Sequence, residues 1–72
     1  MKIEFDYKGG DVTAVKVNGH CVGLIQRRYA GDGRHFWPLD EYQWFLPEVV
    51  GNGNDEINKK VTQMLNERSL GE

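Results

Sequence analysis

The dipeptide Asn18-Gly19 is the feature that most constrains how this chain can fold. Both central positions of a two-residue type I′ turn need positive φ, and asparagine followed by glycine is the pair that adopts it most readily. The flanking runs are rich in β-branched residues, so we expect strands over residues 12–17 and 20–29. The residues that this turn places opposite one another are Val17 and His20, and Val15 and Val22.

Two further strands are expected beside this hairpin. Residues 2–8 alternate charged and apolar side chains, which is the period of a half-buried strand. A glycine-rich turn follows residue 29 and predicts a fourth strand over residues 34–39. Taking Gly9–Asp11 as a three-residue turn unites the apolar residues on one face. The residues expected on this core face are Ile3, Phe5, Tyr7, Thr13, Val15, Val17, His20, Val22 and Leu24.

The C-terminal half predicts one helix after an irregular stretch. Residues 40–50 fit either an ordered loop or a short helical segment, because Pro47 stops any helix that begins near Asp40. Residues 55–69 carry apolar side chains at helical spacing, and Asn54 can cap their first turn. The members of this apolar stripe are Ile57, Val61, Met64 and Leu65.

The expected architecture is a single domain over residues 1–72 of the α+β class. It is a small antiparallel β-meander of three to four strands, followed by one C-terminal helix packed on one sheet face. A chain of 72 residues has room for one small core.

Several function classes find no support in the composition. No residues are spaced as metal ligands, and no nucleophile stands beside a base and an orienting group, so we expect no metal, no cofactor and no enzymatic activity. Cys21 is the single cysteine, which fits a reducing compartment. The N-terminal residues do not form a signal peptide, and no apolar run would span a membrane. A cytoplasmic protein is expected.

Residues 27–37, RRYAGDGRHFW, form the segment with the strongest indication of binding. Extending the strand register through the turn after residue 29 places Trp37 and Leu39 beneath the helix, with Gln26, Arg28 and His35. The opposite, open face would then carry Arg27, Tyr29, Arg34 and Phe36. Aromatic residues are also concentrated here: six of the eight lie between residues 29 and 45, too many for one small core, so Trp44 is expected at the surface.

Arginine, tyrosine and tryptophan dominate binding hot spots. We therefore expect a non-enzymatic protein-binding module, such as an adaptor, inhibitor or regulator of bacterial or phage origin. Its contact residues would be Arg27, Tyr29, Arg34, Phe36 and Trp44. One alternative is a nucleic-acid-binding module that uses the same hairpin, although the net charge of −2 argues against a broad basic footprint. The other alternative is a homodimer, which would add core to a short chain.

Overall fold

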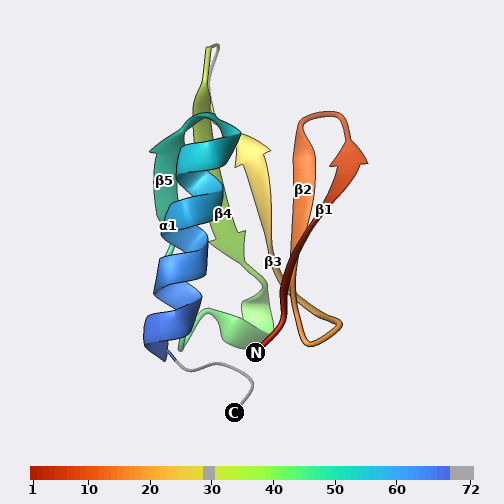
Figure 1. Cartoon of the computed structure of the whole chain (residues 1–72), viewed down its shortest axis with the longest axis vertical. Coiled ribbons are helices and arrows are strands. Elements are labelled where there is room, and N and C mark those ends of the chain that lie inside the picture. Colours follow the sequence, from red (N-terminus) through yellow and green to blue (C-terminus); the bar gives the residue numbers. More distant parts are fainter. Residues whose placement is uncertain (29–30, 69–72) are drawn as a thin grey trace.

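The computed structural model describes residues 1–28 and 31–68, and it shows a five-stranded antiparallel sheet followed by one helix (Figure 1). The strands lie in chain order, each beside the next, so the sheet is a simple meander. The elements are β1 (Ile3–Gly9), β2 (Val12–Val17), β3 (His20–Arg27), β4 (Gly33–Pro38), the 3₁₀ turn η1 (Asp40–Tyr42), β5 (Val49–Asn52) and α1 (Gly53–Arg68). The α+β class is confirmed, with one strand more than expected.

The additional strand, β5, comes from the segment that the sequence left open. Gln43 donates from Nε2 to Asp40 Oδ1 over 3.0 Å, but the helical start is only the single turn of η1. After Pro47 the chain pairs with β4, with Val49 opposite Phe36. The amide of Gly53 then bonds to the Asp32 carbonyl over 2.6 Å, which ties the start of α1 to the β3–β4 connection.

The Asn18-Gly19 turn forms as predicted, but the predicted three-residue turn over Gly9–Asp11 is wrong. Gly9 pairs with Val12, and a β-bulge between Tyr7 and Gly9 keeps the β1 side chains on the expected face. Val17 lies opposite His20 across the Asn18-Gly19 turn, where both turn residues have positive φ. On the other side of β2, the β1 residues Ile3, Phe5 and Tyr7 lie opposite Val17, Val15 and Thr13, which confirms that these six residues share a face.

A β-bulge in β3 then changes the register. Lys16 pairs with Cys21, but the next residue of β2, Val15, pairs with Gly23, so Val22 is an extra residue on β3. The predicted pairing of Val15 with Val22 is therefore wrong. A bulge puts two residues opposite one and so reverses the alternation of every residue beyond it. The Val22 carbonyl accepts a bond from the Leu39 amide over 2.9 Å, which satisfies the backbone at this irregularity.

The reversal exchanges the two faces of the β3–β4 hairpin. Arg27 pairs with Arg34, and Ile25 pairs with Phe36, so arginines and phenylalanine do share one face. That face is the one on which α1 packs, and the prediction that it is open is wrong. Phe36 is fully buried, at 0% exposed. Trp37, expected beneath the helix, lies half-buried on the opposite face.

Gly23 supplies a steric reason for this arrangement. A Cβ at this position would lie 2.4 Å from Cε1 of Phe36 and 2.6 Å from the Trp37 carbonyl oxygen. The phenylalanine ring therefore occupies the space that a side chain would need. Phe36 can be buried here because the residue beside the bulge is a glycine, and any side chain at position 23 would displace the ring.

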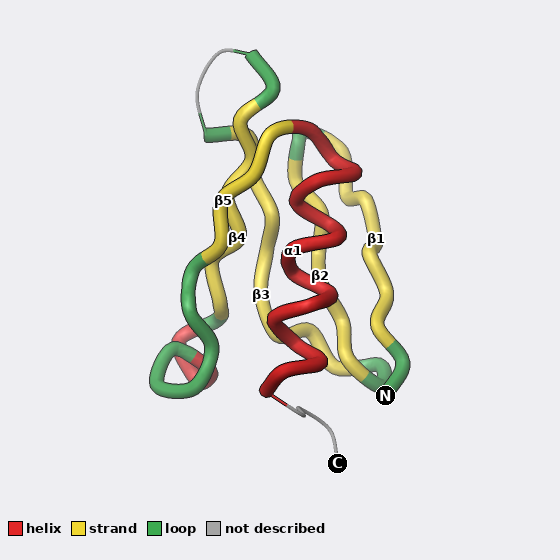
Figure 2. Tube along the Cα trace, turned by 60° about the vertical axis from the view of Figure 1, so that its left-hand side comes forward, coloured by secondary structure: helices red, strands yellow, loops and turns green. Residues whose placement is uncertain are grey.

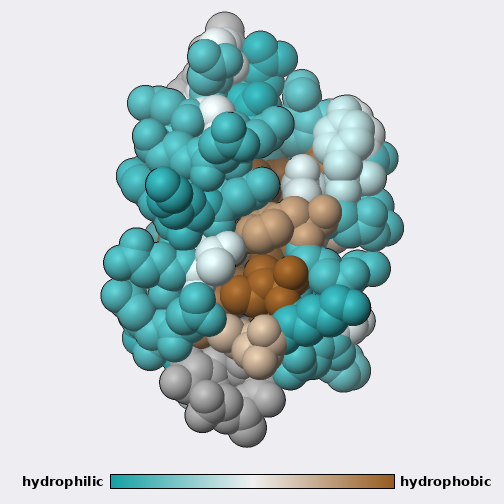
Figure 3. All heavy atoms as spheres, viewed as in Figure 1, coloured by the Kyte–Doolittle hydropathy of each residue, from teal (hydrophilic) through white to brown (hydrophobic). Residues whose placement is uncertain are grey.

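The core lies between the sheet and α1. The helix packs most closely on β5 and β4, and its predicted apolar stripe is buried. Figure 2 shows α1 lying along one face of the sheet. Between α1 and the β1–β2 hairpin, apolar surface remains visible in a hollow (Figure 3). The buried core residues are Val15, Val17, Val22, Ile25, Phe36, Leu46, Ile57, Val61, Met64 and Leu65. Within residues 1–28 and 31–68, no helix has the length and apolar character needed to cross a membrane.

Candidate binding site at the arginine pair

Arg27 and Arg34 are direct cross-strand partners at the turn end of the β3–β4 hairpin. Two like charges opposite each other in a sheet repel, so their placement on one face costs free energy unless other groups compensate. Alternation in the sheet puts both side chains on the α1 side. The site therefore lies where the hairpin, the β1–β2 turn and the start of α1 meet.

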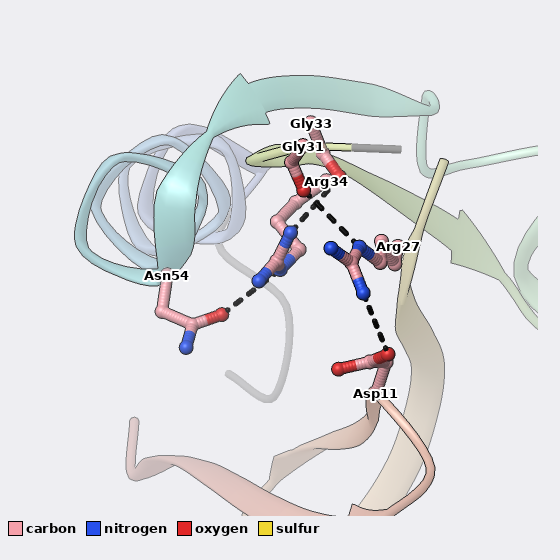
Figure 4. A network of polar contacts seen from close by, with 6 residues as sticks. All are labelled: Asp11, Arg27, Gly31, Gly33, Arg34 and Asn54. Atoms are coloured by element: carbon pink, nitrogen blue, oxygen red, sulfur yellow. Dashed lines mark hydrogen bonds and ion pairs between the residues drawn. The ribbon is translucent and has the colours of Figure 1, made fainter. Parts of the chain in front are cut away.

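The Arg27 guanidinium is held between two segments (Figure 4). Its Nε donates to the Gly31 carbonyl over 3.1 Å, and its Nη1 donates to Asp11 Oδ2 over 3.4 Å. Asp11 comes from the β1–β2 turn and has a φ of 63°. Both ionic side chains are about half exposed, so the pair is screened by solvent and orients the arginine more than it stabilises the fold.

The Arg34 guanidinium is held by the hairpin and by the helix. Its Nη1 donates to the Gly33 carbonyl over 3.1 Å, and its Nε donates to the side-chain oxygen of Asn54 over 3.2 Å. Asn54 lies in the first turn of α1. The sequence predicts this residue as a helix cap, whereas the structure shows its oxygen accepting a bond from Arg34.

Within residues 1–28 and 31–68, the Asp11 carboxylate is the one ion-pair partner of the two guanidinium groups, so the cluster carries an excess of positive charge. The nearby Glu56 is engaged elsewhere: its Oε2 accepts from the Asn52 amide over 2.9 Å and lies 3.4 Å from Lys60 Nζ. The Asn52 amide is the main cause of a lowered Glu56 pKa. Guanidinium groups bind carboxylate and phosphate groups through paired N–H donors, so the site can take an anion. A small pocket beside it is lined by Tyr7, Asp11, Thr13, Ile25, Arg34 and Asn54.

The other residues predicted to bind a partner do not join this cluster. Phe36 is in the core, so its predicted place on the binding surface is wrong. Tyr29 lies outside the described residues. Trp44 is 82% exposed and follows η1, which comes after the end of β4 that is far from the β3–β4 turn. Its indole Nε1 donates to the Glu41 carbonyl over 2.9 Å, which fixes the ring orientation.

Two groups of this structure have no counterpart in the sequence prediction. Asp11 follows Gly10 in the β1–β2 turn and Asn54 follows Gly53 at the start of α1, and nothing local indicates that they meet arginines 16 and 20 residues away. On the opposite sheet face, His35 is 6% exposed and its ring stacks on Trp37, with centroids 3.9 Å apart. His35 Nε2 lies 2.7 Å from Glu48 Oε1, and this contact depends on the unpredicted approach of residue 48 to β4.

Among residues 1–28 and 31–68, no group of three or more histidine, cysteine or acidic side chains could hold a metal ion. Comparisons of the chain with protein-family models, with curated proteins and with solved structures found no match. The arginine pair is the candidate functional site because it concentrates oriented charge on a surface built from three separate segments.

Proposed function

We propose that this chain is a non-enzymatic protein-binding module that takes an acidic segment of a partner protein at Arg27 and Arg34. The observation that supports it is the cross-strand pairing of these two arginines, each held by a main-chain carbonyl. Carbonyl bonds leave the remaining guanidinium N–H groups as donors. A partner carboxylate would offset the repulsion between the two cations.

The site is partly ordered before binding. Arginine loses much side-chain freedom when it is immobilised at an interface, at a cost of about 0.5–1.5 kcal/mol for each such side chain. Here the bonds to Asp11, Gly31, Gly33 and Asn54 already restrict both guanidinium groups. Such preorganisation favours affinity for a ligand with few contacts.

A protein partner is favoured over a nucleic acid by the charge of the whole chain. The formal net charge is −2, and residues 41–72 hold six acidic side chains against three basic ones. Affinity for nucleic acid depends on releasing counterions from many phosphates, and two arginines release few. Nucleic-acid binding through the same hairpin is the weaker proposal and forms a separate arm of the test.

The experiment compares capture by the wild-type protein and by an Arg27→Ala/Arg34→Ala variant. Each is immobilised and exposed to a bacterial lysate, and each is titrated with a short glutamate-rich peptide while the arginine Nε–H signals are followed by NMR. A Lys59→Ala/Arg68→Ala variant, which removes the same charge from exposed positions of α1, is the control.

The proposal predicts that the peptide shifts the Arg27 and Arg34 signals, and that the Arg27→Ala/Arg34→Ala variant alone loses capture. Equal capture by all three proteins would contradict it. A gel shift at low salt that retards DNA or RNA, together with no response to the peptide, would replace it with the nucleic-acid reading.

A further inference from the structure

The β1 strand is an edge of the sheet with hydrogen-bonding groups directed outward. The Asn18 amide bonds to the Lys2 carbonyl over 2.8 Å, which fixes the pattern of the β1–β2 ladder. Hydrogen-bonded pairs alternate along antiparallel strands, so Glu4 and Asp6 also bond toward β2. The amides and carbonyls of Ile3, Phe5 and Tyr7 therefore point away from β2, at the edge of the sheet.

The side chains of the same three residues lie on a part of the sheet that the core covers only partly. The helix packs on β4 and β5. Ile3 and Phe5 are only partly buried against the core, and Tyr7 is 68% exposed. Figure 3 shows the apolar hollow between α1 and this hairpin. An edge strand that has unpaired backbone groups and carries a row of apolar side chains is suited to pair with another strand.

The charges along β1 favour a second copy of the same strand in one register. If two copies pair antiparallel around Phe5, Glu4 faces Asp6 and Lys2 faces Lys8. Every charged pair across the two strands would then consist of like charges, which repel. If they pair around Asp6, Glu4 of each copy faces Lys8 of the other, and Phe5 faces Tyr7. Opposite charges and aromatic pairs across strands each contribute about 0.2–1 kcal/mol.

The two Asp6 carboxylates would then meet at the symmetry axis, and each carries its own counterions. Asp6 Oδ2 lies 2.7 Å from Lys8 Nζ and 3.3 Å from Lys16 Nζ. The Lys8 bond, followed by the Lys16 bond, lowers the Asp6 pKa. Pairing around Glu4 would instead bring together two carboxylates for which no salt bridge is present among the described residues.

We propose that two copies of this chain associate through β1, antiparallel and with Asp6 on the two-fold axis, into one continuous ten-stranded sheet. The two α1 helices lie on the same face, and the Ile3, Phe5 and Tyr7 strips of both copies adjoin between them. This proposal rests on the β1 edge alone and is independent of the arginine site.

A disulfide test reads the register directly. Residues at the axis of a non-hydrogen-bonded antiparallel pair have Cα atoms about 4.5 Å apart, which a disulfide can bridge. In a Cys21→Ser background, Asp6→Cys is expected to form a covalent dimer under mild oxidation, whereas Glu4→Cys, on the same face two residues away, is not. Faster cross-linking of Glu4→Cys would overturn the register, and a failure of both would overturn the pairing.

A charge-exchange series keeps every native backbone group and provides a second readout. Glu4→Lys and Lys8→Glu each create like-charged pairs, so sedimentation equilibrium should show the dimer dissociation constant rising about tenfold for either variant. The Glu4→Lys/Lys8→Glu double variant should restore part of the affinity, because positions 4 and 8 of the facing copies again carry opposite charges, whereas Asp6 loses its contact with Lys8. A wild-type protein that remains monomeric at high concentration, or a double variant weaker than both single ones, would contradict the proposal.

Discussion

At the scale of single residues, the structure depends on the contact between Gly23 and Phe36, in which the phenylalanine ring occupies the space that a side chain at position 23 would need. The glycine has no side chain where the bulge brings β3 against β4, and the ring of Phe36 fills that space. The same contact decides which side of the hairpin faces the helix. Two substitutions test it.

Gly23→Ala should lower the free energy of unfolding by about 1–3 kcal/mol, because the added methyl group has to displace Phe36 or the Trp37 carbonyl. Gly33→Ala is the matched control in the neighbouring strand, where a Cβ meets nothing within 4 Å. Urea unfolding of both variants gives the comparison. Equal stability of the two variants would show that the ring does not occupy this space.

Phe36→Ala should cost about 3–5 kcal/mol, as expected for a fully buried aromatic ring. Trp44→Ala removes a larger side chain that is 82% exposed and should change stability by less than about 0.5 kcal/mol. Thermal or urea unfolding distinguishes the two outcomes. A larger loss for Trp44→Ala would place the core elsewhere.

At the scale of secondary structure, elements with a regular period were predictable and the irregularities between them were not. The alternation of residues 2–8, the Asn18-Gly19 turn and the stripe from Ile57 to Leu65 correctly gave β1, the β2–β3 hairpin and α1. The bulge at Val22 has no comparable local signature, and one inserted residue reverses every face beyond it. That single reversal moved Phe36 into the core and Trp37 out of it.

The candidate site was predictable only in part, for the same reason. The pairing of Arg27 and Arg34 on one face follows from alternation across their hairpin, which the sequence supplies. Their contacts with Asp11 and Asn54 depend on which face that is, and therefore on the bulge. β5 was missed because it is four residues long and follows Pro47, so it has too few residues to establish a period.

The junction between β5 and α1 predicts a dependence on pH. The Asn52 amide, and after it Lys60, lowers the pKa of Glu56 in the folded protein from the usual 4.5. A lowered folded-state pKa contributes stability above the unfolded value, and this contribution is lost as pH falls through the folded pKa. We expect acid unfolding of Glu56→Gln to show a weaker pH dependence below about 4.5 than that of the wild-type protein. Glu67→Gln, in the last turn of α1, is the control. An unchanged acid transition in Glu56→Gln would mean that the Asn52–Glu56 bond does not form.

At the scale of the whole molecule, the elongated shape separates two exposed surfaces. The longest dimension is 36 Å. The arginine pair lies beside the β3–β4 turn, and Trp44 follows η1, beyond the other end of β4. A net charge of −2 is therefore compatible with a locally positive end. This arrangement predicts which forces govern binding.

Binding of a short glutamate-rich peptide should weaken as salt is raised, because the arginine side chains are partly exposed and ions screen them. The Arg27→Ala/Arg34→Ala variant should show little binding at any salt concentration, and Trp44→Ala should retain the wild-type salt dependence. Isothermal titration over a range of ionic strength measures all three. Binding that is insensitive to salt would exclude a charge-based site.

The central claim is that the bulge directs Phe36, and with it Arg27 and Arg34, to the face covered by α1. The most direct measurement is the set of nuclear Overhauser contacts from the aromatic rings of the two neighbouring residues Phe36 and Trp37. We expect contacts from the Phe36 ring to the methyl groups of Ile57, Val61 or Leu65, and contacts from the Trp37 indole to His35 on the opposite face. Contacts from the Trp37 indole to those methyl groups, with the Phe36 ring in solvent, would contradict it.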